Sequence, residues 1–162
     1  MAEAFWARGL PFECARCSAC CRHDPGFVFL SKEDLLSLAG YFGLGALDFV
    51  RRYCRPVDVG SAWRVSLKEK PGYDCILWEE GGCRAYEARP AQCRTYPFWP
   101  GVLDSEADWR AEARECPGVG RGTVISGDEI ARRLMARVDN PPLEFGHEHD
   151  WESIDENTLL GR

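Results

Sequence analysis

The sequence predicts the α+β class: a small single domain in which short helices and short strands are joined by long loops. Segments with a helical spacing of apolar residues are interspersed with segments in which apolar and polar residues alternate. Glycine and proline recur between these segments and divide the chain into short elements. At 162 residues, 45% hydrophobic and 28% charged, the chain has the size and composition of one globular domain.

The first third of the chain predicts one strand followed by two helices. The apolar run 27–30 is typical of a short buried strand. Ser31 and Asp34 form a capping-box pattern that begins a short amphipathic helix. A second helix is expected over residues 46–55, with Cys54 on its apolar face.

The middle of the chain predicts two further strand segments and a hairpin. Residues 62–69 alternate between apolar and polar side chains, which indicates a half-buried strand. Residues 75–78 predict another strand, and the turn at 79–82 returns the chain along residues 83–86. This hairpin would carry a cysteine near each end.

The last third predicts mainly helices. Residues 87–101 contain three prolines and predict a turn, a short helical piece and a loop. A short helix is expected over residues 107–114. Ser126 and Glu129 form a second capping-box pattern, and the helix that they begin is expected to end at Asn140, before two prolines.

Two parts of the chain are expected to differ in their role. Residues 1–140 are expected to form a cysteine-cluster metal-binding domain, for the reasons given below. Residues 141–162 are acidic and loop-like, and we expect them to form a C-terminal tail. The glycine run at 118–122 lacks the spacing of a nucleotide-binding loop, and a tight turn explains it better.

Eight of the nine cysteines carry the strongest functional signal. Four fall within eight residues as Cys-x2-Cys-x2-Cys-Cys, and four more follow among glycine, proline, arginine and aromatic residues. Thiolates are soft ligands for zinc, iron and iron–sulfur clusters, and eight of them suffice for two four-coordinate sites. We therefore expect the long loops to be organised around a cysteine-ligated metal site. The expected ligands are Cys14, Cys17, Cys20, Cys21, Cys75, Cys83, Cys93 and Cys116.

The adjacent pair Cys20 and Cys21 bears on how these ligands are shared. Neighbouring residues usually direct their side chains apart, so the two are expected to serve different centres, or one ligates while the other remains a thiol. The division of the other ligands stays open. Cys54 is left out of the metal set because a cysteine on the apolar face of a helix behaves as a small buried hydrophobe.

Cysteine usage also depends on the compartment. No stretch approaches the roughly 20 apolar residues of a membrane span, and residues 1–8 do not look like a secretory signal. We therefore expect a cytoplasmic protein without a membrane partner. In a reducing compartment a cysteine-rich chain favours metal or redox work, whereas an exported chain would allow four disulfides and one unpaired thiol.

The charge of the chain constrains its partners. The formal net charge is −6 with the cysteines counted as neutral. Eight thiolates holding two dications would lower it to about −10. Because the arginines are scattered over an acidic chain, nucleic acid is not an expected partner. Metal ions are the expected partners, and a protein partner stays open.

A second group of residues surrounds Cys93. Arg89 and Arg94 flank this cysteine, together with Pro90 and Tyr96. We expect Arg89 and Arg94 to be cofactor-binding residues that donate hydrogen bonds toward cluster sulfurs or offset their negative charge. The alternative is that these arginines pair with surface carboxylates.

The joint pattern resembles a known family. The residues that carry it are the run from Phe12 to Arg22, then Leu30, Ser31 and Asp34, then Cys75, the stretch from Cys83 to Phe98, and Cys116-Pro117-Gly118-x-Gly120-x-Gly122. Together they resemble the YkgJ-type CxxCxxCC cysteine-cluster family of zinc- or iron-chelating domains. The resemblance covers about residues 12–122 and implies metal binding through the eight cysteines.

The resemblance does not decide what the metal does, and no catalytic residue is assigned. The first hypothesis is an iron–sulfur or zinc protein, in which an iron–sulfur cluster would have a redox role. The second is a protein-modifying enzyme, since a flagellin lysine N-methylase contains a domain similar to this family. The third is a zinc-stapled interaction module without redox activity.

Overall fold

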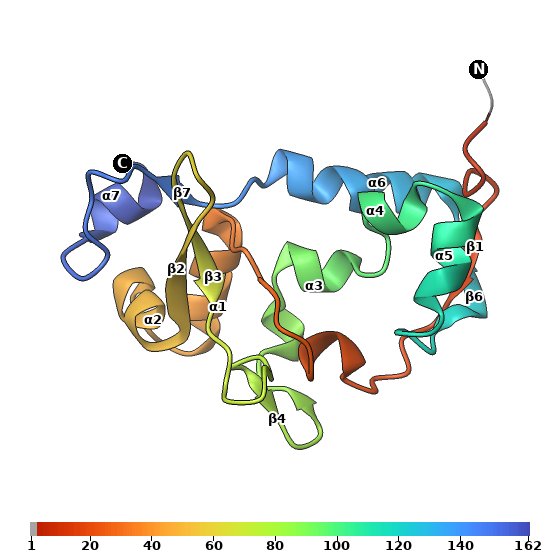
Figure 1. Cartoon of the computed structure of the whole chain (residues 1–162), viewed down its shortest axis with the longest axis horizontal. Helices are drawn as coiled ribbons and strands as arrows, with labels where there is room; N and C mark the ends of the chain where they lie inside the picture. Colours follow the sequence, from red (N-terminus) through yellow and green to blue (C-terminus); the bar gives the residue numbers. More distant parts are fainter. Residues whose placement is uncertain (1–2) are drawn as a thin grey trace. The chain divides into compact units, whose positions relative to one another are not determined.

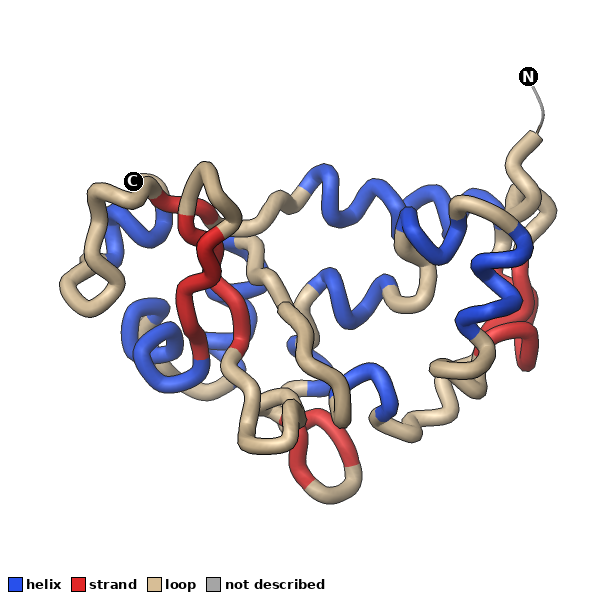
Figure 2. Tube along the Cα trace, viewed as in Figure 1, coloured by secondary structure: helices blue, strands red, loops and turns tan. Residues whose placement is uncertain are grey.

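A computed structural model describes residues 3–162 (Figure 1). Met1 and Ala2, which belong to the expected N-terminal segment, lie outside the described residues. The chain divides into two compact units: unit 1 comprises residues 3–20 and 95–139, and unit 2 comprises residues 21–94 and 140–162. Each unit combines helices with short strands, which confirms the α+β class (Figure 2). Within residues 3–162, no helix is long and apolar enough to cross a membrane.

Unit 1 is built on a two-stranded antiparallel sheet. Strand β1 (Leu10–Phe12) pairs with β6 (Val119–Ile125), and the register places Leu10 opposite Ile125 and Phe12 opposite Val119. Figure 1 shows α5 beside these strands. The helices of unit 1 are α4 (Pro100–Leu103), α5 (Glu106–Glu112) and α6 (Gly127–Asp139).

The core of unit 1 gathers apolar side chains from each of its elements. Phe98 is fully buried and stacks on Trp109, with 5.4 Å between the ring centroids. Phe12 meets Phe98 edge to face at 5.5 Å. Such pairs contribute about 0.5–1.5 kcal/mol beyond the burial of their surface. The buried members of this core are Leu10, Phe98, Leu103, Trp109, Val119 and Ile130.

Unit 2 combines helices with a three-stranded antiparallel sheet in the order β2-β3-β7. A two-stranded hairpin follows the sheet in sequence, and two short 3-10 helices, η1 and η2, lie near the two cysteine-rich segments. The elements that lie wholly in unit 2 are α1 (Lys32–Tyr41), α2 (Ala46–Tyr53), β2 (Cys54–Asp58), β3 (Trp63–Leu67), β4 (Trp78–Glu79), β5 (Gly82–Cys83), η2 (Tyr86–Ala88), β7 (Glu144–Phe145) and α7 (Glu156–Leu160). Two elements contain residues of both units: η1 (Ala19–Cys21) and α3 (Ala91–Thr95). Unit 1 gives way to unit 2 after Cys20, one residue before η1 ends. The chain returns to unit 1 after Arg94, one residue before α3 ends.

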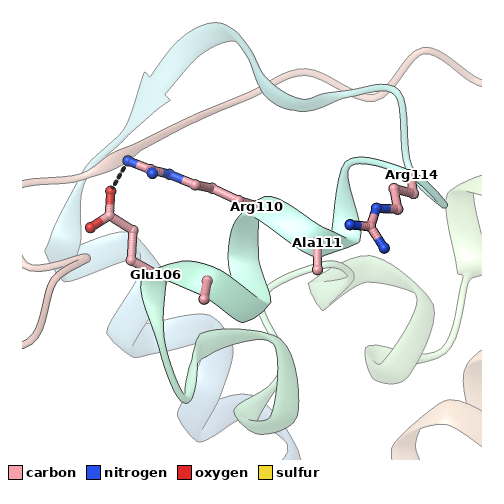
Figure 3. A pocket seen from close by; sticks show the side chains of 5 residues that line it. Glu106, Arg110, Ala111 and Arg114 are labelled. Carbon is pink, nitrogen blue, oxygen red and sulfur yellow. Dashed lines mark hydrogen bonds and ion pairs between the residues drawn. The ribbon is translucent and has the colours of Figure 1, made fainter.

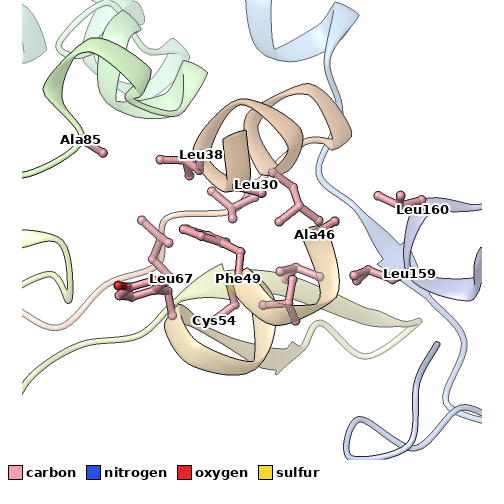
Figure 4. Close-up of a cluster of buried hydrophobic side chains, with 14 of the residues drawn as sticks. Leu30, Leu38, Ala46, Phe49, Cys54, Leu67, Ala85, Leu159 and Leu160 are labelled. Atoms are coloured by element: carbon pink, nitrogen blue, oxygen red, sulfur yellow. The ribbon is translucent and has the colours of Figure 1, made fainter. Parts of the chain in front are cut away.

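The core of unit 2 is separate from that of unit 1. Phe49 lies at its centre, among leucines from the first helix and the sheet (Figure 4). Leu159 and Leu160 of α7 are also buried in it. The acidic C-terminal segment, expected to be loop-like, therefore contains β7 and α7 and supplies buried side chains to this core.

The capping box at the start of α1 is confirmed. The Ser31 hydroxyl accepts a hydrogen bond from the Asp34 backbone N–H at 3.1 Å, and the Asp34 carboxylate accepts one from the Ser31 N–H at 3.0 Å. The second oxygen of Asp34 accepts the backbone N–H of Ala91 at 2.8 Å. A cap predicted from sequence thus also fixes the start of α3.

The expected strand at 27–30 is wrong. Phe29 makes only an isolated bridge with Ser66. Its backbone N–H donates to the Gln92 side chain at 3.2 Å, and the N–H of Val28 donates to the Ser66 hydroxyl at 3.1 Å. The N–H of Leu30 donates to the Val65 carbonyl oxygen and that of Leu67 donates to the Val28 carbonyl oxygen, both at 3.0 Å. Because the Ser66 hydroxyl takes the Val28 N–H, the pairing with β3 stops at this single bridge.

Three further boundaries differ from those expected. The helix expected to reach residue 55 ends at Tyr53, and the chain continues as β2, where Pro56 is incompatible with a helix interior. Residues 75–77 form a turn, and the hairpin strands begin only at Trp78. The glycine run at 118–122 lies at the start of strand β6, where Gly120 and Gly122 have φ of +76° and +77°.

Candidate metal centre

The eight candidate cysteines are divided equally between the two units. Unit 1 contains Cys14, Cys17, Cys20 and Cys116, and unit 2 contains Cys21, Cys75, Cys83 and Cys93. Cys14, Cys17 and Cys20 are exposed, and the other five are half-buried. The nine cysteines all lie within residues 3–162, and no disulfide forms among them.

Strand pairing brings Cys14 toward Cys116 in unit 1. Beyond the Phe12–Val119 pair, the backbone N–H of Glu13 donates to the carbonyl oxygen of Gly118 at 3.3 Å. A Cβ added to Gly118 would lie 2.1 Å from the Glu13 carbonyl oxygen. Glycine is therefore required here, because any side chain would push apart the two segments that carry Cys14 and Cys116.

Cys116 occupies the first position of a tight turn. Its carbonyl oxygen accepts the backbone N–H of Val119 at 3.1 Å, and the N–H groups of Gly118 and Val119 also donate toward its sulfur. Burial raises the pKa of the Cys116 thiol, the two amides lower it, and the negative charge of Cys17 and Cys20 raises it further.

Cys14 also receives an amide hydrogen bond. The backbone N–H of Arg16 donates to the Cys14 Sγ at 3.4 Å. Arg16 and Ser18 have φ of 52° and 63°, a left-handed conformation that non-glycine residues adopt at a cost. These two residues turn the backbone around Cys17, which lies between them.

Tyr96 lies beside the same cysteines. Its hydroxyl donates to the carboxylate of Glu112. Burial raises the pKa of Tyr96, and the hydrogen bond to Glu112 and the negative charges of Glu112, Cys116 and Cys20 raise it further. Tyr96 is therefore a neutral hydrogen-bond donor next to the cysteines of unit 1.

In unit 2, the segments of Cys21 and Cys75 are joined directly. The backbone N–H of Cys75 donates to the carbonyl oxygen of Cys21 at 2.8 Å. The neighbouring side chains Arg22 and Asp74 form an ion pair at 3.2 Å. Burial opposes the ionisation of Asp74, but the hydrogen bonds and charge of Arg22 and His23 outweigh it and lower the pKa of this carboxyl.

Cys75 occupies a turn of the same kind as Cys116. Its carbonyl oxygen accepts the backbone N–H of Trp78 at 2.9 Å, and the N–H groups of Leu77 and Trp78 donate toward its sulfur. Burial raises the pKa of the Cys75 thiol, the amides lower it, and the negative charge of Cys83 raises it. Cys83 lies opposite Trp78 in the hairpin, and Cys75 precedes the first hairpin strand, so the two cysteines are not a directly opposed pair.

Trp78 leaves one buried polar group without an acceptor. Among residues 3–162, its indole N–H is buried and makes no hydrogen bond. The Arg22 guanidinium lies 3.8 Å from the centroid of the Trp78 ring. Since residues opposite each other in an antiparallel pair share a face, the Trp78 and Cys83 side chains lie on the same face of the hairpin. A thiolate is the kind of acceptor that this N–H lacks.

Cys93 lies within α3, between two arginines that contact protein groups. Arg89 donates to the carbonyl oxygen of Tyr86 at 2.9 Å, and its guanidinium lies 3.7 Å from the centroid of the Tyr86 ring. Arg94 donates to the carbonyl oxygen of Arg89 and lies 4.0 Å from the Asp34 carboxylate. These contacts fix the loop and helix that carry Cys93.

Cys54 differs from the other cysteines. It is 1% exposed and belongs to the core of unit 2 (Figure 4). Burial raises the pKa of its thiol far above the usual range, and only Lys68 opposes this. A thiol that resists deprotonation is a poor metal ligand.

The donor chemistry fits a thiolate-bound metal, but the sulfurs are not gathered into a finished site. Within residues 3–162, no three side chains of His, Cys, Asp or Glu lie close enough together to hold a metal ion. The structure brings together the backbone segments, and the amide donors at Cys14, Cys75 and Cys116 point at their sulfurs. Sequence patterns indicated the cysteines and included Tyr96 in the segment around Cys93, but they gave no signal for Trp78 or the Gly118–Glu13 contact.

A pocket of about 480 Å³ lies on one side of α5. Glu106, Arg110 and Arg114 line it together with two alanines, and no cysteine does (Figure 3). Arg110 pairs with Glu106 at 2.5 Å within the helix. The pocket is therefore a charged helix surface and does not contribute donors to the cysteine sites.

Comparison with known proteins bears on the same residues. A model of the CxxCxxCC family, described as a "Putative zinc- or iron-chelating domain", matches residues 13–117. The chain is 30% identical over 95 residues to the uncharacterized protein MJ0661 of Methanocaldococcus jannaschii. The aligned part covers 57% of this chain and 48% of that protein, so the chain spans about half the length of this relative. No solved structure matches the chain.

Proposed function

Because this chain belongs to the CxxCxxCC family, we propose that it chelates zinc or iron through eight cysteines, none of which is Cys54. The metal-binding part is assigned to residues 1–140, which contain all of these cysteines. The proposed ligands are Cys14, Cys17, Cys20, Cys21, Cys75, Cys83, Cys93 and Cys116.

The observation that carries this proposal is the set of backbone amides directed at sulfur. Cys14, Cys75 and Cys116 each accept one or two amide N–H groups from residues two or three positions later. Burial raises the pKa of the Cys75 and Cys116 thiols, and these amides oppose that rise because hydrogen bonds to the charged form of a group favour that form. Thiolates are the form in which cysteine binds metal.

The surrounding side chains support the same role. Four thiolates around one dication leave a net charge of −2, which nearby donors and cations offset. Arg22 adjoins Cys21, and we assign Arg89 and Arg94 to the support of Cys93 in the same way. Their contacts with Tyr86 and Asp34 hold both guanidinium groups near the helix that bears Cys93.

The metal decides the chemistry. Closed four-thiolate zinc sites are structural, and zinc here would stabilise loops that have few strand hydrogen bonds of their own. An iron–sulfur cluster would add electron transfer, with a potential set by hydrogen bonds to its sulfurs. In either case the chain supplies thiolates, amide donors and arginines.

The test is direct analysis of protein purified without oxygen. Zinc, iron and acid-labile sulfide are measured per chain, together with the visible spectrum. Colourless protein with bound zinc supports a structural scaffold, and brown protein with matching iron and sulfide supports a redox role. Protein that holds neither metal after reconstitution under reducing conditions would contradict the proposal. The variant Cys54→Ser is the matched control and should bind as much metal as the wild type.

A further inference from the structure

We infer that the eight cysteines form two four-thiolate centres, one in each unit, and that the division falls between the adjacent residues Cys20 and Cys21. The inference rests on the proposed function and specifies its ligand sets. The centre of unit 1 would contain Cys14, Cys17, Cys20 and Cys116. The centre of unit 2 would contain Cys21, Cys75, Cys83 and Cys93.

The two compact units of the chain divide the eight candidate ligands equally. The boundary between the units falls directly after Cys20, and it leaves four candidate ligands on each side. Each unit has its own hydrophobic core, so each can hold its own ligands in place. Cys116 packs against the core of unit 1, whereas Cys75 and Cys83 pack against the core of unit 2.

The backbone is a 3-10 helix where unit 1 ends and unit 2 begins. Cys20 and Cys21 lie in the 3-10 helix η1. Successive side chains in a 3-10 helix are separated by about 120° around its axis. Two adjacent sulfurs in this conformation point in different directions, which suits ligands of different centres.

In unit 1, strand pairing connects the segments that carry its four cysteines. The β1–β6 pairing, extended by the Glu13–Gly118 hydrogen bond, places Cys14 near the turn of Cys116. Cys17 and Cys20 follow Cys14 on the same segment, where the left-handed residues Arg16 and Ser18 turn the backbone. The strand pairing therefore brings the segment that carries Cys14, Cys17 and Cys20 next to the turn of Cys116.

In unit 2, backbone and side-chain hydrogen bonds connect the segments that carry its four cysteines. Cys21 and Cys75 are joined by a backbone hydrogen bond of 2.8 Å, and the Arg22–Asp74 ion pair reinforces it. Cys83 follows in the hairpin that begins three residues after Cys75. Cys93 is the remaining candidate of the unit. Its neighbour Gln92 bonds to Phe27 and Phe29 in the segment that follows Cys21.

Each unit contains one cysteine in the same kind of turn, in which backbone amides donate to the carbonyl oxygen and the sulfur of that cysteine. In both, the cysteine carbonyl accepts the N–H of the third following residue, and the sulfur receives the N–H groups of the second and third. Cys116 provides this turn in unit 1 and Cys75 provides it in unit 2. One such turn for each centre is what two independent sites require.

The test compares double variants by the zinc bound per chain after reconstitution with zinc under reducing conditions. Loss of two ligands from one centre should remove one half of the zinc, in Cys14→Ser/Cys116→Ser and equally in Cys75→Ser/Cys93→Ser. Loss of one ligand from each centre, in Cys14→Ser/Cys75→Ser, should remove nearly all of it. The control Cys54→Ser should keep the wild-type amount.

The outcomes separate the inference from the proposed function. If Cys14→Ser/Cys116→Ser loses all its zinc, or Cys14→Ser/Cys75→Ser keeps half, the division of ligands is wrong although metal binding stands. A wild type that binds no metal would instead contradict the proposed function.

A second measurement uses the wild type alone, so that misfolding of a variant cannot confuse the result. Zinc is withdrawn stepwise with a chelator, and iodoacetamide then labels the exposed thiols for mapping by mass spectrometry. The cysteines should become reactive in two groups of four, with the membership given above, while Cys54 stays protected. Labelling in any other grouping, or of all eight together, would overturn the division.

Discussion

The carbonyl oxygen of Glu13 lies so close to Gly118 that a Cβ on residue 118 would stand 2.1 Å from it. This contact is the tightest link between the segment that carries the CxxCxxCC run and the turn of Cys116. It connects a fold requirement with the proposed centre of unit 1, because the two segments can approach only over a residue without a side chain.

Gly118→Ala should therefore damage the centre of unit 1 and spare that of unit 2. The added methyl group forces the backbone to shift, at a cost of about 1–3 kcal/mol. We expect zinc per chain to fall by about half, as measured by metal analysis after gel filtration. The control is Gly101→Ala, where the structure leaves open space around the new Cβ. Equal zinc content in the two variants would contradict this role for Gly118.

Asp34→Ala should destabilise unit 2. Asp34 is 4% exposed and accepts the backbone N–H groups of both Ser31 and Ala91. Its removal takes the carboxylate acceptor away from both buried amides, at about 1–3 kcal/mol each. Urea unfolding should show this loss in the free energy of unfolding. The exposed neighbour Glu33, changed to alanine, should cost less than about 1 kcal/mol, and a similar effect of the two changes would refute the prediction.

Trp78→Phe should speed the loss of metal from unit 2, and it should not lower the stability of the metal-free protein. The variant removes a buried N–H that has no acceptor within residues 3–162. Without metal, that loss should leave stability unchanged or raise it, because an unsatisfied donor is costly. With metal, it should remove a donor to thiolate and speed the release of zinc to a chelator.

The release rate from the cysteines of unit 1 is the internal control for Trp78→Phe, and thiol labelling follows both units in one sample. An unchanged release rate in unit 2 would show that the indole N–H does not serve the centre.

Glu129→Gln should lower stability at neutral pH and have little effect in acid. The hydrogen bond from Arg133 lowers the pKa of Glu129 below its usual 4.5, and the charges of Arg133 and Arg132 act in the same direction. A carboxyl whose pKa is lowered by folding stabilises the fold above its unfolded-state pKa, and this contribution disappears as the pH falls through the folded value.

Melting curves at pH 7 and pH 3, recorded with chelator and reductant present, should therefore show a difference between wild type and Glu129→Gln only at pH 7. Asp128→Asn, on the same helix turn, is the control. A difference that persists unchanged at pH 3 would mean that the effect is not due to the carboxylate charge.

Local patterns predicted the parts of the fold that depend on neighbouring residues. The Ser31–Asp34 capping box, the alternating strand at 63–67 and the helix after Ser126 all depend on side chains within a few positions of each other. The α+β class followed from the same signals. The spacing of Cys14, Cys17, Cys20 and Cys21 pointed to the family that matches residues 13–117, whereas their role as ligands stays a prediction.

The rest depended on contacts between distant parts of the chain. The pairing of β1 with β6 joins residues more than 100 positions apart, and neither strand alternates clearly enough to be predicted alone. The segment 27–30 is apolar, yet the amides of Val28 and Phe29 donate to the side chains of Ser66 and Gln92. The inferred grouping of the cysteines rests on long-range contacts such as the β1–β6 pairing and the Cys75–Cys21 hydrogen bond, which is why spacing alone left it open.

X-ray absorption at the edge of the bound metal tests the central claim, that thiolates alone hold the metal, most directly. For zinc-loaded protein the account predicts four sulfur ligands at about 2.3 Å and no nitrogen or oxygen ligand. The Cys54→Ser variant should give the same spectrum. A first shell that contains nitrogen or oxygen, or fewer than four sulfurs, would contradict the assignment of the eight cysteines as ligands.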